Sequence, residues 1–125
     1  MPKQAIQTDK APLPGGAYSQ AVRAGDFIFV AGTVPRHPQT GATPATIEEQ
    51  TALTLDNIRA ILEAAGATMD DVVKTTVHLS DLSLFQQFNS VYATYFNDPK
   101  PVRTTVGSQL NNILVEIDVV AYVGS

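Results

Sequence analysis

The segment formed by residues 114–122 constrains the fold more than any other part of the chain. It is rich in β-branched residues, and its side chains alternate in character, so it predicts a strand with two different faces. One face is wholly apolar and suits a core covered by helices; it carries Val115, Ile117, Val119, Ala121 and Val123. The opposite face is mixed; it carries Leu114, Glu116, Asp118, Val120 and Tyr122.

The mixed face of this strand needs an explanation because it holds two carboxylates among apolar side chains. Burying an unpaired charge costs several kcal/mol, so Glu116 and Asp118 require a cation, solvent or a ligand. The same face is too apolar to suit bulk water. We therefore expect it to form a subunit interface that contains pockets.

The segment before it, residues 101–106, carries Arg103 and Thr105 on one face of a second predicted strand. We predict that the two strands pair across the intervening turn, with Thr105 opposite Glu116 and Arg103 opposite Asp118. All four side chains then line the mixed face, and Arg103 becomes an anion clamp beside a carboxylate. On the residues alone, an interfacial ion pair without any substrate is the alternative interpretation.

Turn and cap signals divide the rest of the chain into further elements. Gly25-Asp26 separates two apolar runs and predicts a β-hairpin. Thr46-Ile47-Glu48-Glu49 has the form of a capping box and begins a helix that Gly66 ends. The predicted order is a hairpin, a helix, a strand, a helix and two strands, at residues 21–31, 46–65, 73–79, 84–96, 101–106 and 114–122. This order predicts an α+β fold with both helices packed on one face of a sheet.

Length and composition bound the class of protein. A chain of 125 residues is typical of one domain, so we expect a single domain over residues 1–125. No apolar stretch approaches the roughly 20 residues that span a bilayer, and the first residues lack a secretory pattern, so the expected location is the cytoplasm. The absence of cysteine excludes disulfides, thiolate metal sites and a cysteine nucleophile.

Charge and histidine content narrow the function further. The net charge is −4, and the lysines and arginines are spread along the chain, which disfavours nucleic acid as a partner. His37 lies in a proline-rich loop and His78 on an alternating strand, and neither has a second ligand or a nucleophile at motif spacing. We therefore predict neither a metal site nor a catalytic histidine.

Eight short segments together resemble the RidA/YjgF family of reactive-intermediate deaminases, which is also described as an endoribonuclease family. These segments are GGAYSQA (15–21), GDFIFVAG (25–32), TLDNI (54–58), EAAG (63–66), VVKTTV (72–77), FNSVY (88–92), VRTTV (102–106) and VEI (115–117). The resemblance implies a two-layer chorismate-mutase-like fold and a homotrimer with clefts between subunits. It also implies hydrolysis of enamines or imines such as 2-aminoacrylate to a 2-keto acid and ammonia, without a cofactor.

The same resemblance implies roles for particular residues. Arg103 would hold the substrate carboxylate, and Glu116 would orient or activate the attacking water. Other side chains would border or line the cleft: Tyr18, Asn89, Ala31, Gly32 and Thr105. Three positions depart from the residues common in the family, since Ala17, Ala31 and Thr105 stand where proline, serine and cysteine are frequent. These departures leave the substrate preference open.

Two other functions are compatible with the same residues. The first is a non-catalytic binder of small carboxylates that uses the same cleft. The second is an RNA-directed, endoribonuclease-type activity, against which the acidic net charge weighs. Three measurements distinguish these functions. Turnover of small imines indicates the deaminase, saturable carboxylate binding without turnover indicates the binder, and salt-sensitive RNA binding indicates the RNA-directed activity.

Overall fold

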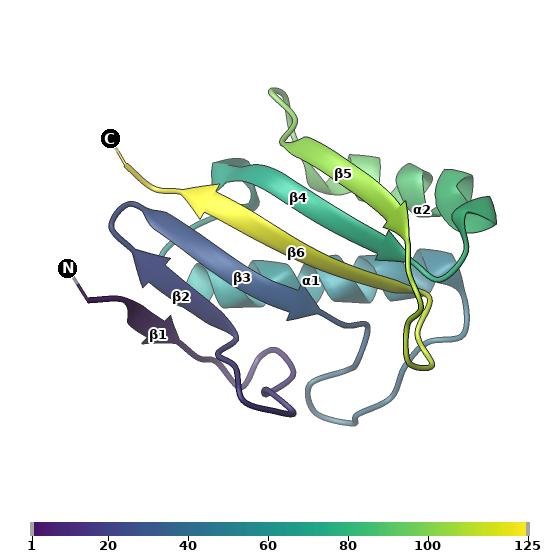
Figure 1. Cartoon of the computed structure of the whole chain (residues 1–125), viewed down its shortest axis with the longest axis horizontal. Helices are drawn as coiled ribbons and strands as arrows, with labels where there is room; N and C mark the ends of the chain where they lie inside the picture. The colour runs from purple at the N-terminus through teal and green to yellow at the C-terminus, as the bar shows by residue number, and fades with distance from the viewer. Residues whose placement is uncertain (1, 125) are drawn as a thin grey trace.

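The computed structural model describes residues 2–124, which form one mixed sheet covered on one face by two helices (Figure 1). Its main elements, in chain order, are β1 (Gln4–Ile6), β2 (Ala21–Ala24), β3 (Phe27–Thr33), α1 (Ile47–Ala64), β4 (Val72–Leu79), α2 (Phe85–Tyr92), β5 (Val102–Gly107) and β6 (Val115–Tyr122). Short 3₁₀ helices extend them: η1 (Met69–Asp71), η2 (Leu82–Leu84) and η3 (Ala93–Tyr95). The strand order is β1-β2-β3-β6-β4-β5.

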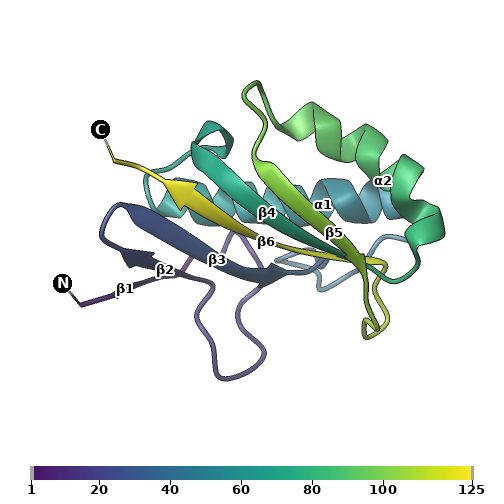
Figure 2. The same ribbon diagram turned by 45° about the horizontal axis from the view of Figure 1, so that its top comes forward.

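The predicted fold class is confirmed, because six strands and two helices make an α+β protein with both helices behind the sheet (Figure 1, Figure 2). The hairpin of β2 and β3 turns at Gly25, which has φ +60°, a conformation that suits glycine. β1 adds an edge strand that the sequence analysis did not predict; it has only three residues, too few for a visible alternation.

The pairing predicted for the last two strands is wrong. β6 lies between β3 and β4, antiparallel to both, whereas β5 lies at the sheet edge and is parallel to β4. The connection 108–114 passes the end of β4, where Ser108 N donates to Leu79 O at 2.8 Å and Ser80 N donates to Leu114 O at 2.9 Å. The chain therefore inserts its most apolar strand in the sheet centre, where both edges are hydrogen-bonded, and leaves β5 outside.

The N-terminus of α1 shows the predicted capping box. Thr46 Oγ1 accepts a hydrogen bond from Glu49 N at 3.2 Å and donates one to Glu49 Oε1 at 3.0 Å. After the helix, Gly66 takes φ +80°, which only glycine adopts readily. Local sequence signals therefore set both ends of α1, as expected.

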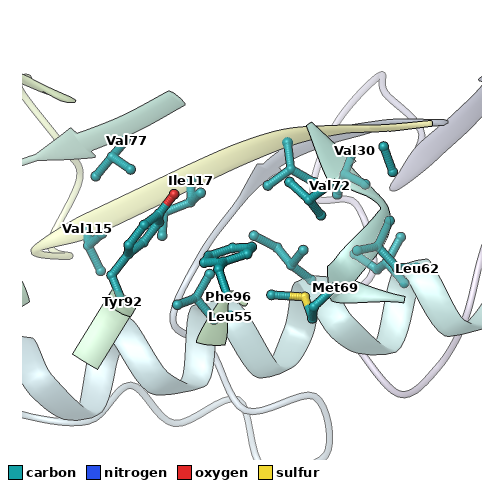
Figure 3. Packing of buried hydrophobic residues seen from close by; sticks show 14 of the residues in the cluster. Val30, Leu55, Leu62, Met69, Val72, Val77, Tyr92, Phe96, Val115 and Ile117 are labelled. Atoms are coloured by element: carbon teal, nitrogen blue, oxygen red, sulfur yellow. The ribbon is translucent and has the colours of Figure 1, made fainter. Parts of the chain in front are cut away.

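The core lies between the sheet and the two helices (Figure 3). Four alternate residues of β6 point into it and are at most 1% exposed: Val115, Ile117, Val119 and Ala121. Leu55 and Leu62 of α1 and Phe88 and Tyr92 of α2 pack against them from the helix layer. The apolar face predicted for residues 114–122 is therefore confirmed.

The opposite face of the sheet is not covered by any element of residues 2–124. Three of its aromatic side chains form an exposed cluster, in which the ring centroids of Phe27 and Phe29 are 6.4 Å apart and those of Phe27 and Tyr122 are 5.2 Å apart. Glu116 and Asp118 lie half-buried on this open face. No helix in the part of the chain that the structure describes is long and apolar enough to cross a membrane.

Candidate functional site

Arg103 lies on the helix-covered face of β5, not on the open face. Its guanidinium carbon is 4.8 Å from the ring centroid of Tyr92, 5.3 Å from that of Phe85 and 5.8 Å from that of Phe88. Its Nη1 donates a hydrogen bond to Asn89 Oδ1 at 2.7 Å. The aromatic face of α2 and one amide therefore hold the guanidinium in place, partly by cation–π attraction.

This placement follows from the pairing of β5 with β4. Arg103 lies beside Thr75, and Thr75 points into the core, so the parallel register turns Arg103 and Thr105 toward the helices. The Tyr92 hydroxyl shares a 2.8 Å hydrogen bond with Thr75 Oγ1. Burial raises the pKa of Tyr92, so the ring stays neutral and presents its face to the guanidinium.

No carboxylate of residues 2–124 neutralises Arg103. Among residues 2–124, one ion pair has its charged atoms within 4.0 Å, that of Arg59 with Asp56 at 3.5 Å, and Arg103 takes no part in it. The predicted juxtaposition of Arg103 with Asp118 is wrong for a single chain, because the two side chains lie on opposite faces of the sheet. A guanidinium has five N–H donors, so Arg103 keeps donors for a further acceptor.

The guanidinium borders a surface hollow of about 380 Å³. The hollow is lined by Asn89, Tyr92, Ala93, Lys100, Pro101 and Arg103. Its volume lies at the lower end of the range for small-molecule sites, about 300–1,000 Å³. The hollow therefore joins two predicted site residues, Asn89 and Arg103, to a space that a small acid could occupy.

Glu116 belongs to a different part of the molecule. It lies opposite His78 of β4 on the open face, and its carboxylate leans over Gly32 of β3, within a β-bulge between Val30 and Thr33. A Cβ at residue 32 would overlap Glu116 Oε2 and lie 3.0 Å from the carboxyl carbon. Gly32 therefore leaves the space that the Glu116 carboxylate occupies.

Tyr18, Ala31 and Gly32 line a second, smaller hollow of about 20 Å³ near Glu116. This volume is about that of one water-sized probe. Tyr18 is 54% exposed, and its hydroxyl accepts a hydrogen bond from Gly15 N at 3.2 Å, so the ring folds back over its own glycine loop. The structure thus brings these three predicted residues together around one hollow, and Glu116 lies against one of them, Gly32.

The two groups of predicted site residues are far apart within one chain. Along β4, Arg103 is level with Thr75 and Glu116 is level with His78, and β5 and β6 flank β4 on either side. Three residues along and two strand spacings across put the Cα atoms of Arg103 and Glu116 about 14 Å apart. Because the side chains also point to opposite faces, one chain alone does not form a site that contains both.

The aromatic residues of α2 have a role that the sequence analysis missed. Phe88 and Tyr92 belong to the core and Phe85 packs against it, and the same rings also hold the Arg103 guanidinium. Their spacing of three and four residues places them with Asn89 on one helix face. An aromatic stripe on a helix, followed by an arginine on the next strand, was the sequence signal that could have predicted this contact.

The two histidines take part in local hydrogen bonds. His37 Nδ1 accepts from Gln39 N at 3.2 Å and from Thr40 N at 3.3 Å, within a turn. His78 Nδ1 and Ser108 Oγ are 2.7 Å apart. Within the described range 2–124, no cluster of three or more histidine, aspartate or glutamate side chains could hold a metal ion.

Comparison with known proteins places this α+β chain in a defined class. The family model described as Endoribonuclease L-PSP matches residues 8–123. A RutC family protein of Pyrococcus abyssi is 50% identical over 98% of each chain, and Reactive Intermediate Deaminase A of Arabidopsis thaliana is 40% identical over 95% of this chain and 65% of its own. The crystal structure of Escherichia coli TdcF with bound serine has a TM-score of 0.89 at 35% identity, and the match covers 95% of this chain and 98% of that one.

The chain therefore belongs to the RidA/YjgF family, whose model carries the endoribonuclease description and whose members include reactive intermediate deaminases. The resemblance found in the eight sequence segments is confirmed. The TdcF structure also carries a small amino acid, which is a property of that protein.

Proposed function

We propose that this protein hydrolyses small enamines or imines of the 2-aminoacrylate type to a 2-keto acid and ammonia. The observation that carries the proposal is the Arg103 guanidinium, which three aromatic rings and Asn89 hold beside a hollow of about 380 Å³, with no carboxylate of the described residues in contact. Such a guanidinium binds a carboxylate through two parallel hydrogen bonds and so fixes its orientation. The deaminase names of relatives support the same reaction class.

The proposed chemistry needs one placed water and one acid–base group. An enamine first takes a proton on carbon and becomes an imine, whose carbon is electrophilic. Water then adds to that carbon to give a carbinolamine, and Glu116 accepts one of the water's two protons and passes it to the amino nitrogen. The C–N bond breaks to release ammonia as the remaining hydroxyl proton is lost to solvent and the C=O bond of the 2-keto acid forms, which balances the proton first taken up on carbon. Acid–base assistance of this kind contributes about 10²–10⁴-fold, and positioning by Arg103 supplies more.

We propose further that each site forms between two copies of the chain. The Arg103 group, with Asn89 and Thr105, would face the Glu116 group of a neighbouring copy, with Tyr18, Ala31 and Gly32. The roughly 14 Å separation and the opposite orientations of Arg103 and Glu116 support this arrangement. A closed ring of three copies, in which the β5–α2 edge of each chain meets the open sheet face of the next, satisfies the contact for every chain.

The test is ammonia release from 2-aminoacrylate that a serine dehydratase generates in the same vessel. The wild-type protein is expected to accelerate the release, and Arg103→Ala is expected to remove at least 100-fold of the gain, because it deletes the carboxylate anchor. Arg59→Ala is the matched control, since Arg59 pairs with Asp56 and stacks on Tyr95 away from the hollow.

Two outcomes would contradict the proposal. Arg103→Ala as active as the wild type would remove Arg103 from the mechanism. Saturable binding of pyruvate with no acceleration of ammonia release would instead indicate a non-catalytic carboxylate binder.

A further inference from the structure

We propose that the hollow beside Arg103 takes substrates that carry a second anionic group, and that Lys100 binds this group. The inference rests on the proposed function of Arg103 and narrows its substrate class. The favoured substrates are then imines of 2-keto dicarboxylates rather than those of simple 2-keto acids.

The hollow beside Arg103 is positively charged, which favours a ligand with two negative charges. Two of its six lining residues, Lys100 and Arg103, are cationic at neutral pH, and none of the six is acidic. Tyr92 adds no negative charge, because burial raises its pKa above the ordinary value. A monocarboxylate would neutralise only one of the two cations, whereas a dicarboxylate would match both.

Hydrogen bonds to two backbone carbonyl groups hold the Lys100 ammonium in place. Its Nζ donates hydrogen bonds to the carbonyl oxygen of Phe96 and, at 3.4 Å, to that of Ala93, at the end of the α2–η3 segment. An ammonium has three N–H donors, so one remains for a ligand. Pro99 and Pro101 flank Lys100 and restrict the backbone on both sides. The charge is thus held at the rim of the hollow instead of moving freely in solvent.

Lys100 and Arg103 have no carboxylate among the described residues that would compete with a bound anion. No carboxylate lies within 4.0 Å of Lys100 or Arg103 in the described residues. Helix capping alone accounts for two of the three donors of Lys100, but it does not require the lysine to border the same hollow as Arg103. A capping role and a binding role predict different effects of substitution on ligand preference, which makes them separable.

The experiment compares the binding of two stable 2-keto acids by calorimetry, 2-oxobutanoate with one carboxylate and 2-oxoglutarate with two. The wild-type protein is expected to bind 2-oxoglutarate about tenfold more tightly, the effect of one charge-assisted hydrogen bond. Lys100→Gln is expected to bring the ratio of the two dissociation constants close to one, and Lys100→Arg to preserve it. Lys10→Gln, which removes an exposed lysine elsewhere, is the matched control for net charge.

Equal affinities in the wild type, or an unchanged ratio in folded Lys100→Gln, would overturn the inference. Folding is checked by thermal unfolding, and Lys100→Arg provides a second variant that retains the cation. The deaminase activity of Arg103→Ala separates the proposed function from the proposed role of Lys100. If Arg103→Ala abolishes deamination while the affinity ratio of the wild type is one, the proposed function stands and only the role of Lys100 fails.

Discussion

At the scale of single residues, the contact of Gly32 with Glu116 shows how a missing side chain makes room for a carboxylate. The carboxylate occupies the space in which a Cβ at residue 32 would stand. The family resemblance implies that both residues belong to the cleft, but it gives no physical reason for the glycine. The reason is steric, and it depends on a β-bulge that brings strand β3 under Glu116.

Gly32→Ala is expected to displace the Glu116 carboxylate and to lower kcat for imine hydrolysis by about 10- to 100-fold, as misplacement of a catalytic group by about 1 Å does. The affinity for 2-oxobutanoate should change much less, because Arg103 provides that contact. Steady-state kinetics and calorimetry measure the two effects.

Gly107→Ala is the matched control for this substitution, since a Cβ there would meet Leu82 at an ordinary 3.5 Å. Equal losses of kcat in the two alanine variants would show that the Gly32–Glu116 contact has no special role.

At the scale of elements, the 3₁₀ helix η3 is joined to α1 by a hydrogen bond whose donor we expect to titrate at alkaline pH. Tyr95 in η3 donates from its hydroxyl to Asp56 Oδ1 at 2.9 Å and to Ala52 O at 3.2 Å, both on α1. Burial and the Asp56 carboxylate raise the pKa of Tyr95 to about 12. In the unfolded chain the pKa of tyrosine is about 10.

The contribution of Tyr95 to stability is therefore complete below pH 10 and is lost as the pH rises from 10 to about 12, because the unfolded chain releases the phenol proton first. We expect Tyr95→Phe to flatten this alkaline loss. Urea unfolding at pH values from 8 to 11.5 measures it, and Tyr92, whose pKa is also raised, contributes to the slope that remains. Parallel curves for Tyr95→Phe and the wild type would contradict the assignment.

For the strands, the local sequence pattern predicted the buried face of β6 but not its neighbours in the sheet. The alternation in residues 114–122 correctly predicted which side chains of β6 enter the core. It did not predict the neighbours of the strand, because the assumption that consecutive strands pair was wrong here. Pairing depends on contacts distant in sequence, and these turned Arg103 and Thr105 to the helix side.

At the scale of the whole molecule, the separation of Arg103 from Glu116 gives a direct test of assembly. Arg103→Ala and Glu116→Gln are each expected to be inactive alone. Unfolding the two variants together and refolding them at equal concentration should restore about a quarter of wild-type activity, the share of random contacts that join one intact Arg103 group to one intact Glu116 group. The coupled ammonia assay measures the recovery.

Each variant refolded alone is the control for this experiment. Absence of any recovery in mixed oligomers, with oligomer size confirmed by light scattering, would show that the site does not form between copies.

The amino-acid sequence alone determined the elements other than β1, the apolar face of β6, the α+β class and, by resemblance, the family. These properties follow from caps, turns and side-chain periodicity, which act over a few residues. Only the tertiary structure decided that β6 enters the sheet centre, that α2 presents its aromatic edge to Arg103, and that Glu116 lies on the opposite face. The physical reason is that strand order is set by the burial of the most apolar strand across long sequence separations, which no local pattern records.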